Sequence, residues 1–251
     1  MKTVLITGCS SGFGLEIARY FLDREWQVIA TMRTPRADLL PASDRLRVLS
    51  LDVTDPDSVG AAVKAAGPID ALVNNAGVGA AAPFELTEPA LARALFETNT
   101  LGTMAMTQAV LPQFRSRGAG TIVNVTSTVT LKALPLLSMY TASKAAVNAF
   151  SASMAIELAP FGIDVRIVLP GRSPETRFGD NAHRQGLENA DYAELVQQTI
   201  ARITDETGPV TYATDVADAV WRAATDPDAP MRLPAGADAV EWARDAGIAI
   251  Q

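Results

Sequence analysis

The feature that most constrains the fold of this chain is the alternation of short apolar runs with helical stretches. Six runs indicate strands: "KTVLIT" (2–7), "WQVIATM" (26–32), "RLRVLSLDV" (45–53), "IDALVNNAG" (69–77), "GTIVNVTS" (120–127) and "GIDVRIVLPG" (162–171). Helical stretches separate them at 14–25, 55–65, 89–117 and 139–161. Continuous apolar runs suit a parallel sheet that is covered on both faces. With right-handed crossovers, the pattern predicts an α/β fold: a Rossmann-type, doubly wound parallel sheet flanked by helices on both faces.

The chain after residue 171 is less regular. Residues 172–191 are rich in Gly, Asn and Asp and are long for a loop, which is typical of a lid. A helix is expected over 216–225, with Thr214 or Asp215 as its N-cap, and a strand over 231–236. We see no linker or repeat, so residues 1–251 are expected to form a single domain.

Composition excludes several classes of function. A net charge of −7 opposes a broad phosphate-binding surface, so no nucleic-acid partner is expected. One histidine, His183, and one cysteine, Cys9, leave no material for a multi-ligand zinc site or a disulfide framework, and no metal is expected. The start of the chain lacks the apolar run of a signal peptide, and residues 98–114 are too polar for a membrane span. We expect a cytoplasmic protein whose acid–base chemistry uses other side chains.

A glycine turn, "TGCSSGFG", lies between the first strand and the first helix. Gly8, Gly12 and Gly14 permit a tight turn, and the helix N-terminus offers unpaired N–H groups to a pyrophosphate. The alternative is a turn that needs glycine only for steric reasons.

The end of the second strand, "ATMRTP", bears on the choice of dinucleotide. A carboxylate there would hold the 2′-hydroxyl of NAD, but this strand offers Met32 and then Arg33, which favours NADP(H) over NAD(H). Arg36 is a second, more distant cation. The alternative is that Arg33 is an ordinary solvated charge.

Further motifs complete a pattern. With "TGCSSGFG", "NNAG" at 74–77, Asn99, Ser127 and "YTASK" at 140–144 in order, the sequence resembles the short-chain dehydrogenase/reductase family, in its compact single-domain branch. The resemblance covers nearly the whole chain. Spacing selects Ser127 over the nearby hydroxyls of Thr126, Thr128 and Ser138, because it lies thirteen residues before the tyrosine.

The resemblance implies four catalytic residues. Tyr140 exchanges the substrate proton, Ser127 binds the reacting oxygen, Lys144 also binds the nicotinamide ribose, and the backbone of Asn99 holds a water on the proton relay. An unperturbed tyrosine has a pKa of about 10, too high for efficient proton exchange near neutrality. A nearby cation stabilises the phenolate, so Lys144 is expected to lower the pKa of Tyr140.

The resemblance also implies the cofactor contacts. These are Gly8, Ser10, Ser11, Gly12, Phe13, Gly14, Arg33, Asp52, Val53, Asn74, Ala76, Gly77, Tyr140, Lys144, Pro170 and Gly171. The "NNAG" segment has an alternative role in stabilising the central sheet. The family commonly places a threonine five residues after Pro170, where this chain has Glu175 and then Thr176, so Thr176 is left unassigned, as is His183. For Cys9, packing beside the cofactor is favoured over redox function.

The sequence therefore predicts an NADP(H)-dependent oxidoreductase that moves hydride between nicotinamide and a carbonyl or secondary alcohol. The loop before the helix that carries Tyr140 contains four leucines: Leu131, Leu134, Leu136 and Leu137. As walls of a pocket they would favour a hydrophobic small-molecule substrate, although they equally suit core or subunit contacts. A non-catalytic NADP(H)-binding sensor or regulatory protein remains an alternative, and so does a sugar-nucleotide epimerase, for which the chain looks short. Related proteins assemble through the helices at 89–117 and 139–161, which implies a homodimer or homotetramer.

Overall fold

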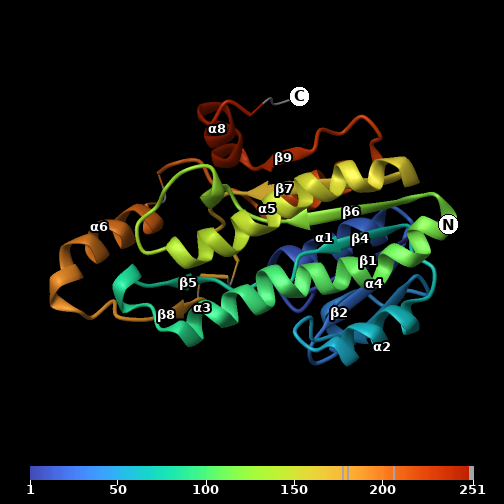
Figure 1. The fold of residues 1–251 in the computed structure, drawn as a ribbon, viewed down its shortest axis with the longest axis horizontal. Helices are drawn as coiled ribbons and strands as arrows, with labels where there is room; N and C mark the ends of the chain where they lie inside the picture. Colours follow the sequence, from blue (N-terminus) through green and yellow to red (C-terminus); the bar gives the residue numbers. More distant parts are fainter. Residues whose placement is uncertain (177, 180, 206, 249–251) are drawn as a thin grey trace.

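The chain folds around one parallel sheet in the computed structural model, which describes residues 1–176, 178–179, 181–205 and 207–248 (Figure 1). Its strands are β1 (Thr3–Ile6), β2 (Gln27–Met32), β3 (Leu46–Ser50), β4 (Ala71–Asn74), β6 (Gly120–Val125), β7 (Ile163–Pro170) and β9 (Arg232–Ala235). They are ordered β3-β2-β1-β4-β6-β7-β9, and every neighbouring pair is parallel. The predicted doubly wound α/β fold is confirmed.

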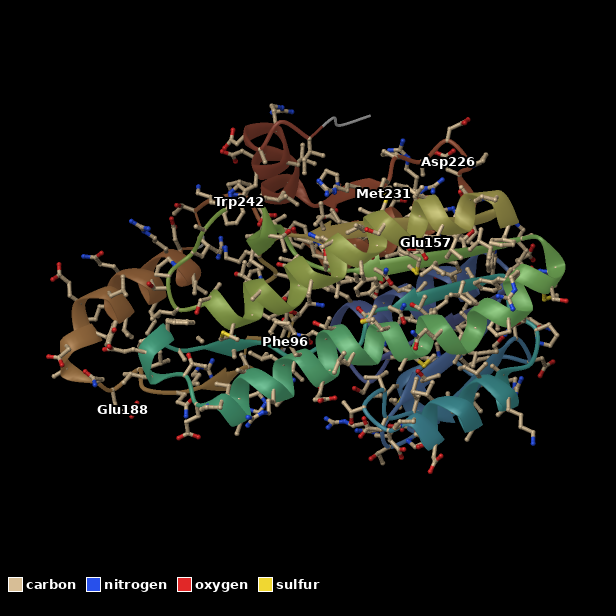
Figure 2. The ribbon with its side chains drawn as sticks, in the orientation of Figure 1. Phe96, Glu157, Glu188, Asp226, Met231 and Trp242 are labelled. Atoms are coloured by element: carbon tan, nitrogen blue, oxygen red, sulfur yellow. The ribbon has the colours of Figure 1, made fainter. Side chains whose placement is uncertain are left out.

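Helices cover both faces of this sheet. On one face, α1 (Gly12–Asp23) and α7 (Ala213–Thr225) pack over a buried cluster that includes Val4 and Ile6. On the other face, α2 (Pro56–Ala66), α4 (Gly102–Arg117) and α5 (Ser138–Leu158) pack over a cluster that includes Leu5. Successive residues of β1 thus enter opposite layers, which explains why its sequence is apolar throughout. Side chains fill the space between the layers (Figure 2).

The predicted helix at 89–117 contains an irregularity around Asn99, the residue that the resemblance assigns to a bend in this helix. It consists of α3 (Pro89–Phe96), a π-helical turn η3 (Glu97–Leu101) that contains Asn99, and α4. A proline inside a helix usually kinks or ends it, but α4 continues past Pro112 to Arg117. Because Gln108 is exposed, the carbonyl that loses its N–H partner at Pro112 is on the side of the helix that water reaches.

Residues 172–191 contain more regular structure than a loop. Strand β8 (His183–Arg184) pairs in parallel with β5 (Ala80–Ala81), and the one-turn helix η6 (Ala190–Tyr192) leads into α6 (Ala193–Thr204). These elements lie together at one end of the molecule (Figure 1). Helix α6 and the C-terminal α8 (Ala237–Asp245) were not predicted.

The start of α7 corrects another prediction. The helix begins at Ala213, with Tyr212 as its N-cap, so neither Thr214 nor Asp215 is the cap. Asp215 lies in the first turn, where its carboxylate accepts a hydrogen bond from the Tyr212 N–H at 2.9 Å. A carboxylate there also suits the positive end of the helix dipole. In the described part of the chain, no helix has both the length and the apolar character needed to cross a membrane.

Candidate active site

The four predicted catalytic side chains come from three places in the fold. Ser127 follows β6 and begins the short helix η4 (Thr128–Thr130), Tyr140 and Lys144 lie on the first turns of α5, and Asn99 lies on η3. All four are buried, with exposed fractions between 0% and 8%. Strand β6 ends at the carboxyl edge of the sheet and α5 begins at that edge, so Ser127 and Tyr140 meet there and are hydrogen-bonded.

The protonation of Tyr140 differs from expectation. Burial raises the pKa of the Tyr140 phenol to about 12, and the hydrogen bond with Ser127 acts in the opposite direction. Burial also lowers the pKa of the Lys144 amine to about 8. The expectation that Lys144 lowers the pKa of Tyr140 is therefore wrong for this structure. Desolvation disfavours the phenolate, and the Lys144 Nζ donates instead to the Val125 carbonyl at 3.0 Å.

Asn99 connects three segments of the site. Its Oδ1 accepts a hydrogen bond from the Val78 N–H at 2.8 Å, and its Nδ2 donates to the Val78 carbonyl at 2.9 Å and to Ser143 Oγ at 3.0 Å. The Ser143 hydroxyl in turn donates to the Tyr140 carbonyl at 2.7 Å. The Asn99 side chain thus joins the end of β4 to α5, and its predicted role in holding a water stays a prediction.

Ser127 is also held by residues that the sequence analysis did not single out. Its Oγ accepts from the Val129 N–H at 3.3 Å, and its carbonyl accepts from the Thr130 hydroxyl at 2.8 Å. Asn148 Nδ2 donates to Thr130 Oγ1 at 2.9 Å. Asn148 follows Lys144 by four residues and Ser143 follows Tyr140 by three. Helical spacing was therefore a usable signal that both belong to the site.

The glycine turn forms a tight cradle against the "NNAG" segment. Gly8 has φ of +75°, and a Cβ there would lie 2.8 Å from Ala76 Cα. A Cβ on Gly14 would overlap the Gly8 carbonyl oxygen. Asn75, which the sequence analysis missed, fastens the turn through Nδ2, which donates to the carbonyls of Thr7 at 2.9 Å and Gly8 at 3.2 Å.

The N-terminus of α1 opens onto this turn. Ser11 is the N-cap, its side chain makes no capping hydrogen bond with the described residues, and the first turn has no acidic residue. The positive end of the helix and its free N–H groups therefore fit a pyrophosphate in the cradle made by Gly8, Gly12 and Gly14, the predicted contacts Ser10 and Phe13 being in the same turn.

The predicted adenosine contacts lie after β2 and β3. Arg33 is exposed, and its charge contributes to a lowered pKa of Asp52, which is set mainly by hydrogen bonds from the Thr54 N–H and hydroxyl. Arg36 instead pairs with Asp38 at 2.6 Å. Val53 packs against Gly102, where a Cβ would lie 2.7 Å from Val53 Cγ2.

The segment after β4 divides into structural and site-facing residues. Asn74 is buried and donates to Asn124 Oδ1 at 2.9 Å and Thr107 Oγ1 at 3.1 Å, which supports the alternative of a sheet-stabilising role. The Ala76 N–H donates to Thr7 Oγ1 at 2.9 Å. A Cβ on Gly77 would lie 3.1 Å from Asn99 Oδ1 and 3.2 Å from Lys144 Nζ, so Gly77 borders the catalytic side chains.

In the segment after β7, Glu175 and Thr176 lie in different surroundings. Pro170 ends β7, and the Gly171 N–H donates to Thr211 Oγ1 at 2.9 Å. Thr176 lies beside the glycine turn, because a Cβ on Gly12 would be 3.6 Å from Thr176 Cβ. The Glu175 carboxylate instead accepts from the backbone N–H of Ala213, at the start of α7.

His183 and Cys9 take no part in the catalytic cluster. His183 is exposed on β8, and its N–H donates to the Gly79 carbonyl at 2.9 Å. Cys9 is fully buried, its Sγ lies 3.3 Å from the Ile6 carbonyl oxygen, and burial raises its thiol pKa to about 12. A buried neutral thiol fits packing, not redox chemistry.

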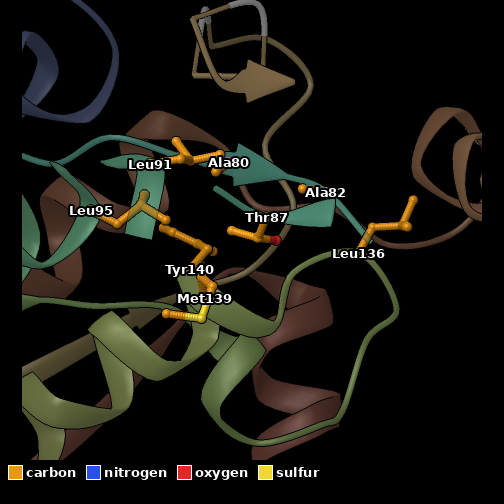
Figure 3. Close-up of a pocket in the computed structure, with 8 residues that line it drawn as sticks. All are labelled: Ala80, Ala82, Thr87, Leu91, Leu95, Leu136, Met139 and Tyr140. Atoms are coloured by element: carbon orange, nitrogen blue, oxygen red, sulfur yellow. The ribbon is translucent and has the colours of Figure 1, made fainter. Parts of the chain in front are cut away.

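A small apolar pocket borders Tyr140. It is lined by Ala80, Ala82, Thr87, Leu91, Leu95, Leu136, Met139 and Tyr140 (Figure 3). Of the four leucines predicted as pocket walls, only Leu136 lines it. The sequence analysis also missed Phe178, whose ring centroid lies 5.7 Å from that of Tyr140.

The fold and this site define a class: a doubly wound α/β protein with a dinucleotide-type glycine turn and a buried Ser, Tyr and Lys. The short chain dehydrogenase profile matches residues 2–185, and the chain belongs to that family. The oxidoreductase YusZ of Bacillus subtilis is 43% identical over 181 residues, which are 68% of this chain and 64% of that protein. The 3-ketodihydrosphingosine reductase of Bacteroides thetaiotaomicron is 33% identical over 241 residues, 94% of this chain and 88% of that protein.

Solved structures agree in fold. A short-chain dehydrogenase from Streptomyces avermitilis has a TM-score of 0.85 and 37% identity, over 97% of this chain and 91% of that one. A Burkholderia cenocepacia short chain dehydrogenase in complex with NADP has a TM-score of 0.79 and 28% identity, over 98% and 94%. A Brucella melitensis 3-ketoacyl-(acyl-carrier-protein) reductase complexed with NADH has a TM-score of 0.78 and 28% identity, over 92% and 95%.

Proposed function

We propose that this chain is an NADP(H)-dependent oxidoreductase that transfers hydride between nicotinamide and the carbonyl or secondary alcohol carbon of a hydrophobic small molecule. The observation that carries the proposal is the Tyr140 hydroxyl, hydrogen-bonded to Ser127 and placed in the wall of an apolar pocket. The nicotinamide, when bound, supplies or accepts the hydride.

The chain's own residues manage the proton and the substrate oxygen. With a pKa raised to about 12, Tyr140 Oη holds its proton at neutral pH and can donate it to the oxygen of a carbonyl under reduction. Ser127 Oγ donates a hydrogen bond to the same oxygen and so stabilises its developing charge. Burial of both groups keeps water from competing for that oxygen.

Other residues hold the cofactor. The glycine turn and the N-terminus of α1 would receive the pyrophosphate, and Lys144 would bind the nicotinamide ribose. Arg33 supports NADP(H), since an exposed guanidinium at the end of β2 can pair with the additional phosphate. Related structures hold NADP or NADH, so the preference for NADP(H) rests on Arg33.

The pocket supports an apolar substrate. Among its lining residues only Thr87 and Tyr140 carry a polar side-chain group. A relative named for reduction of 3-ketodihydrosphingosine adds support for a keto group as the reacting centre. The pocket holds about 10 Å³, room for a single water, so a hydrocarbon portion would enter between its apolar walls only after they move apart, which would leave the carbonyl at Tyr140.

A spectrophotometric screen tests the proposal. Wild type is mixed with NADPH or NADH and a panel of aliphatic ketones and aldehydes of increasing chain length. We expect nicotinamide oxidation that requires a carbonyl compound, is faster with NADPH, and improves with chain length. Turnover by Tyr140→Phe equal to that of wild type would refute the proposed site, and binding without turnover in the wild type would favour the sensor alternative.

We also propose a homodimer or homotetramer. Leu101, at the end of η3, and Ile156, on α5, are exposed at 46% and 79%, although both are large apolar residues. They lie on the two helical stretches through which related proteins associate. Sedimentation velocity tests this: a monomer at micromolar concentration would contradict the proposal, and Ile156→Glu should weaken the assembly.

A further inference from the structure

A buried carboxylate on α8 contacts the backbone directly after β7. Asp238 is 6% exposed, and its Oδ2 accepts from the Arg172 N–H at 2.6 Å. Its Oδ1 accepts from the Thr211 hydroxyl at 2.6 Å. Thr211 Oγ1 in turn accepts from the Gly171 N–H at 2.9 Å, and the Thr211 N–H donates to the Arg172 carbonyl at 2.8 Å. One carboxylate and one hydroxyl therefore hold both amides of the Gly171–Arg172 segment.

The packing around these groups leaves no free space. A Cβ on Gly171 would overlap the Asp238 carboxylate. Gly236 joins β9 to α8 with φ of +100°, and a Cβ on this residue would likewise overlap the Thr211 hydroxyl. Because the two glycines allow this close approach, Asp238 is pressed against the backbone that it hydrogen-bonds. A substitution of Asp238 therefore removes a contact with Gly171 itself.

The place of Gly171 in the sheet gives this contact a functional meaning. Strands β6 and β7 are parallel neighbours, and the Thr126 N–H donates to the Val168 carbonyl at 2.9 Å, so Ser127 and Gly171 leave the sheet at the same edge. Arg33 follows β2 and lies at the same edge of the sheet, but β2 and the pair β6 and β7 are on opposite sides of β1. A dinucleotide lying across the switch between β1 and β4 would have its adenosine near Arg33 and its reactive end near Ser127 and Gly171.

We infer that Asp238 is a positioning residue that fixes the Gly171–Arg172 backbone for the nicotinamide half of the dinucleotide. The inference rests on the proposed function. It requires the hydrogen bonds of Asp238 and not its charge. An asparagine can keep them, because its carbonyl accepts from Arg172 while its amide donates to Thr211 Oγ1, whose own proton turns to the Ala235 carbonyl at 2.8 Å. An alanine leaves the Arg172 N–H without its partner.

Calorimetric titration of the full chain separates the two halves of the ligand. The first ligand is NADPH or NADH, whichever wild type binds more tightly, and the second is the matching adenosine fragment, adenosine 2′,5′-bisphosphate or 5′-AMP. The variants are Asp238→Ala, Asp238→Asn and, as a control on the same helix, exposed Asp245→Ala. We expect Asp238→Ala to weaken dinucleotide binding about tenfold, as loss of a buried hydrogen bond does, with the fragment unchanged within about twofold. Asp238→Asn and Asp245→Ala should resemble wild type.

Several outcomes would overturn the inference. These are wild-type dinucleotide affinity in Asp238→Ala, a parallel loss of dinucleotide and fragment affinity, and an asparagine variant as weak as the alanine variant. If Asp238→Ala does not fold, the Thr211 variants replace it. Thr211→Val should lose dinucleotide affinity selectively, and Thr211→Ser should not. Equal dinucleotide affinities of Thr211→Val and Thr211→Ser would also overturn the inference. Failure of wild type to bind either dinucleotide would instead refute the proposed function, and the inference with it.

Discussion

Asn148 donates a hydrogen bond from Nδ2 to Thr130 Oγ1 at 2.9 Å, and the Thr130 hydroxyl donates to the Ser127 carbonyl at 2.8 Å. The backbone of Ser127 is thus held, through Thr130, from α5, the helix that also carries Tyr140 and Lys144. This relation makes the distance between the serine and the tyrosine depend on a residue that does not contact either side chain.

We predict that Asn148→Ala lowers kcat for carbonyl reduction about tenfold, because one partly buried hydrogen bond is lost from the support of Ser127. Dinucleotide affinity should stay within about twofold of wild type, since Asn148 bonds Thr130 and is not among the predicted cofactor contacts. Steady-state kinetics and fluorescence titration with NADPH measure both. Ser153→Ala, an exposed change on the same helix, is the matched control. An unchanged kcat in Asn148→Ala would show that Ser127 needs no support from α5.

Tyr140→Phe removes the acidic proton and keeps the ring. Turnover should fall by about a hundredfold to ten-thousandfold, the usual contribution of a general acid. NADPH binding should persist, because the ring still packs near Phe178 and the hydroxyl is not needed for the pyrophosphate. Stopped-flow measurement of hydride transfer, with binding followed separately, distinguishes these effects. Equal loss of binding and turnover would indicate a general collapse of the site instead.

The sequence predicted the parts of this protein that local patterns determine. The strands could be predicted because their residues are apolar without interruption. In β1, Val4, Leu5 and Ile6 are all apolar since both faces of the strand are buried. The set of Ser127, Tyr140 and Lys144 was identified by spacing, and the structure brings these residues together. The pKa of Tyr140 was not predictable in this way, because desolvation depends on segments distant in sequence, such as the pocket residues around Ala80 and Leu95.

The missed elements lack a strong local signal. Helix α8 buries Asp238, Ala239 and Ala243, a carboxylate and two small residues, where a pattern search expects large apolar ones. Helix α6 leaves Ile200 and Ile203 exposed at 49% and 48%, so its apolar residues do not mark a single buried face. The partners of Asp238 are 27 and 66 positions away, and no short-range rule connects them.

Arg33 should determine the choice of dinucleotide. Arg33→Ala is predicted to raise the KM for NADPH about tenfold or more and to leave the KM for NADH nearly unchanged, because only the additional phosphate loses a charge-assisted hydrogen bond. Arg36→Ala is the control, since Arg36 already pairs with Asp38. Initial rates with both dinucleotides at fixed carbonyl concentration give the comparison. A larger effect from Arg36→Ala than from Arg33→Ala would move the specificity site to Arg36.

Lys144 should make the protein less stable than it would otherwise be. Burial lowers the pKa of its amine from 10.5 to about 8, so at pH 7 the folded state carries a charge that it does not solvate well. We predict that Lys144→Met abolishes turnover and raises the free energy of unfolding at pH 7 by on the order of 1–3 kcal/mol. Thermal unfolding should show this as an increase of about 2–4 °C in Tm per kcal/mol.

The pH dependence of that difference follows from the direction of the shift. The folded-state pKa lies below the unfolded-state value, so the unfolded chain binds more protons between pH 8 and 10.5. The penalty is therefore complete below pH 8, decreases as the pH rises, and is gone above pH 10.5. Urea denaturation of wild type and Lys144→Met at pH 7 and pH 9 should give a smaller gap at pH 9. A gap that stays constant would mean that the amine loses little solvation on folding, and that its hydrogen bond to Val125 offsets the cost of burial.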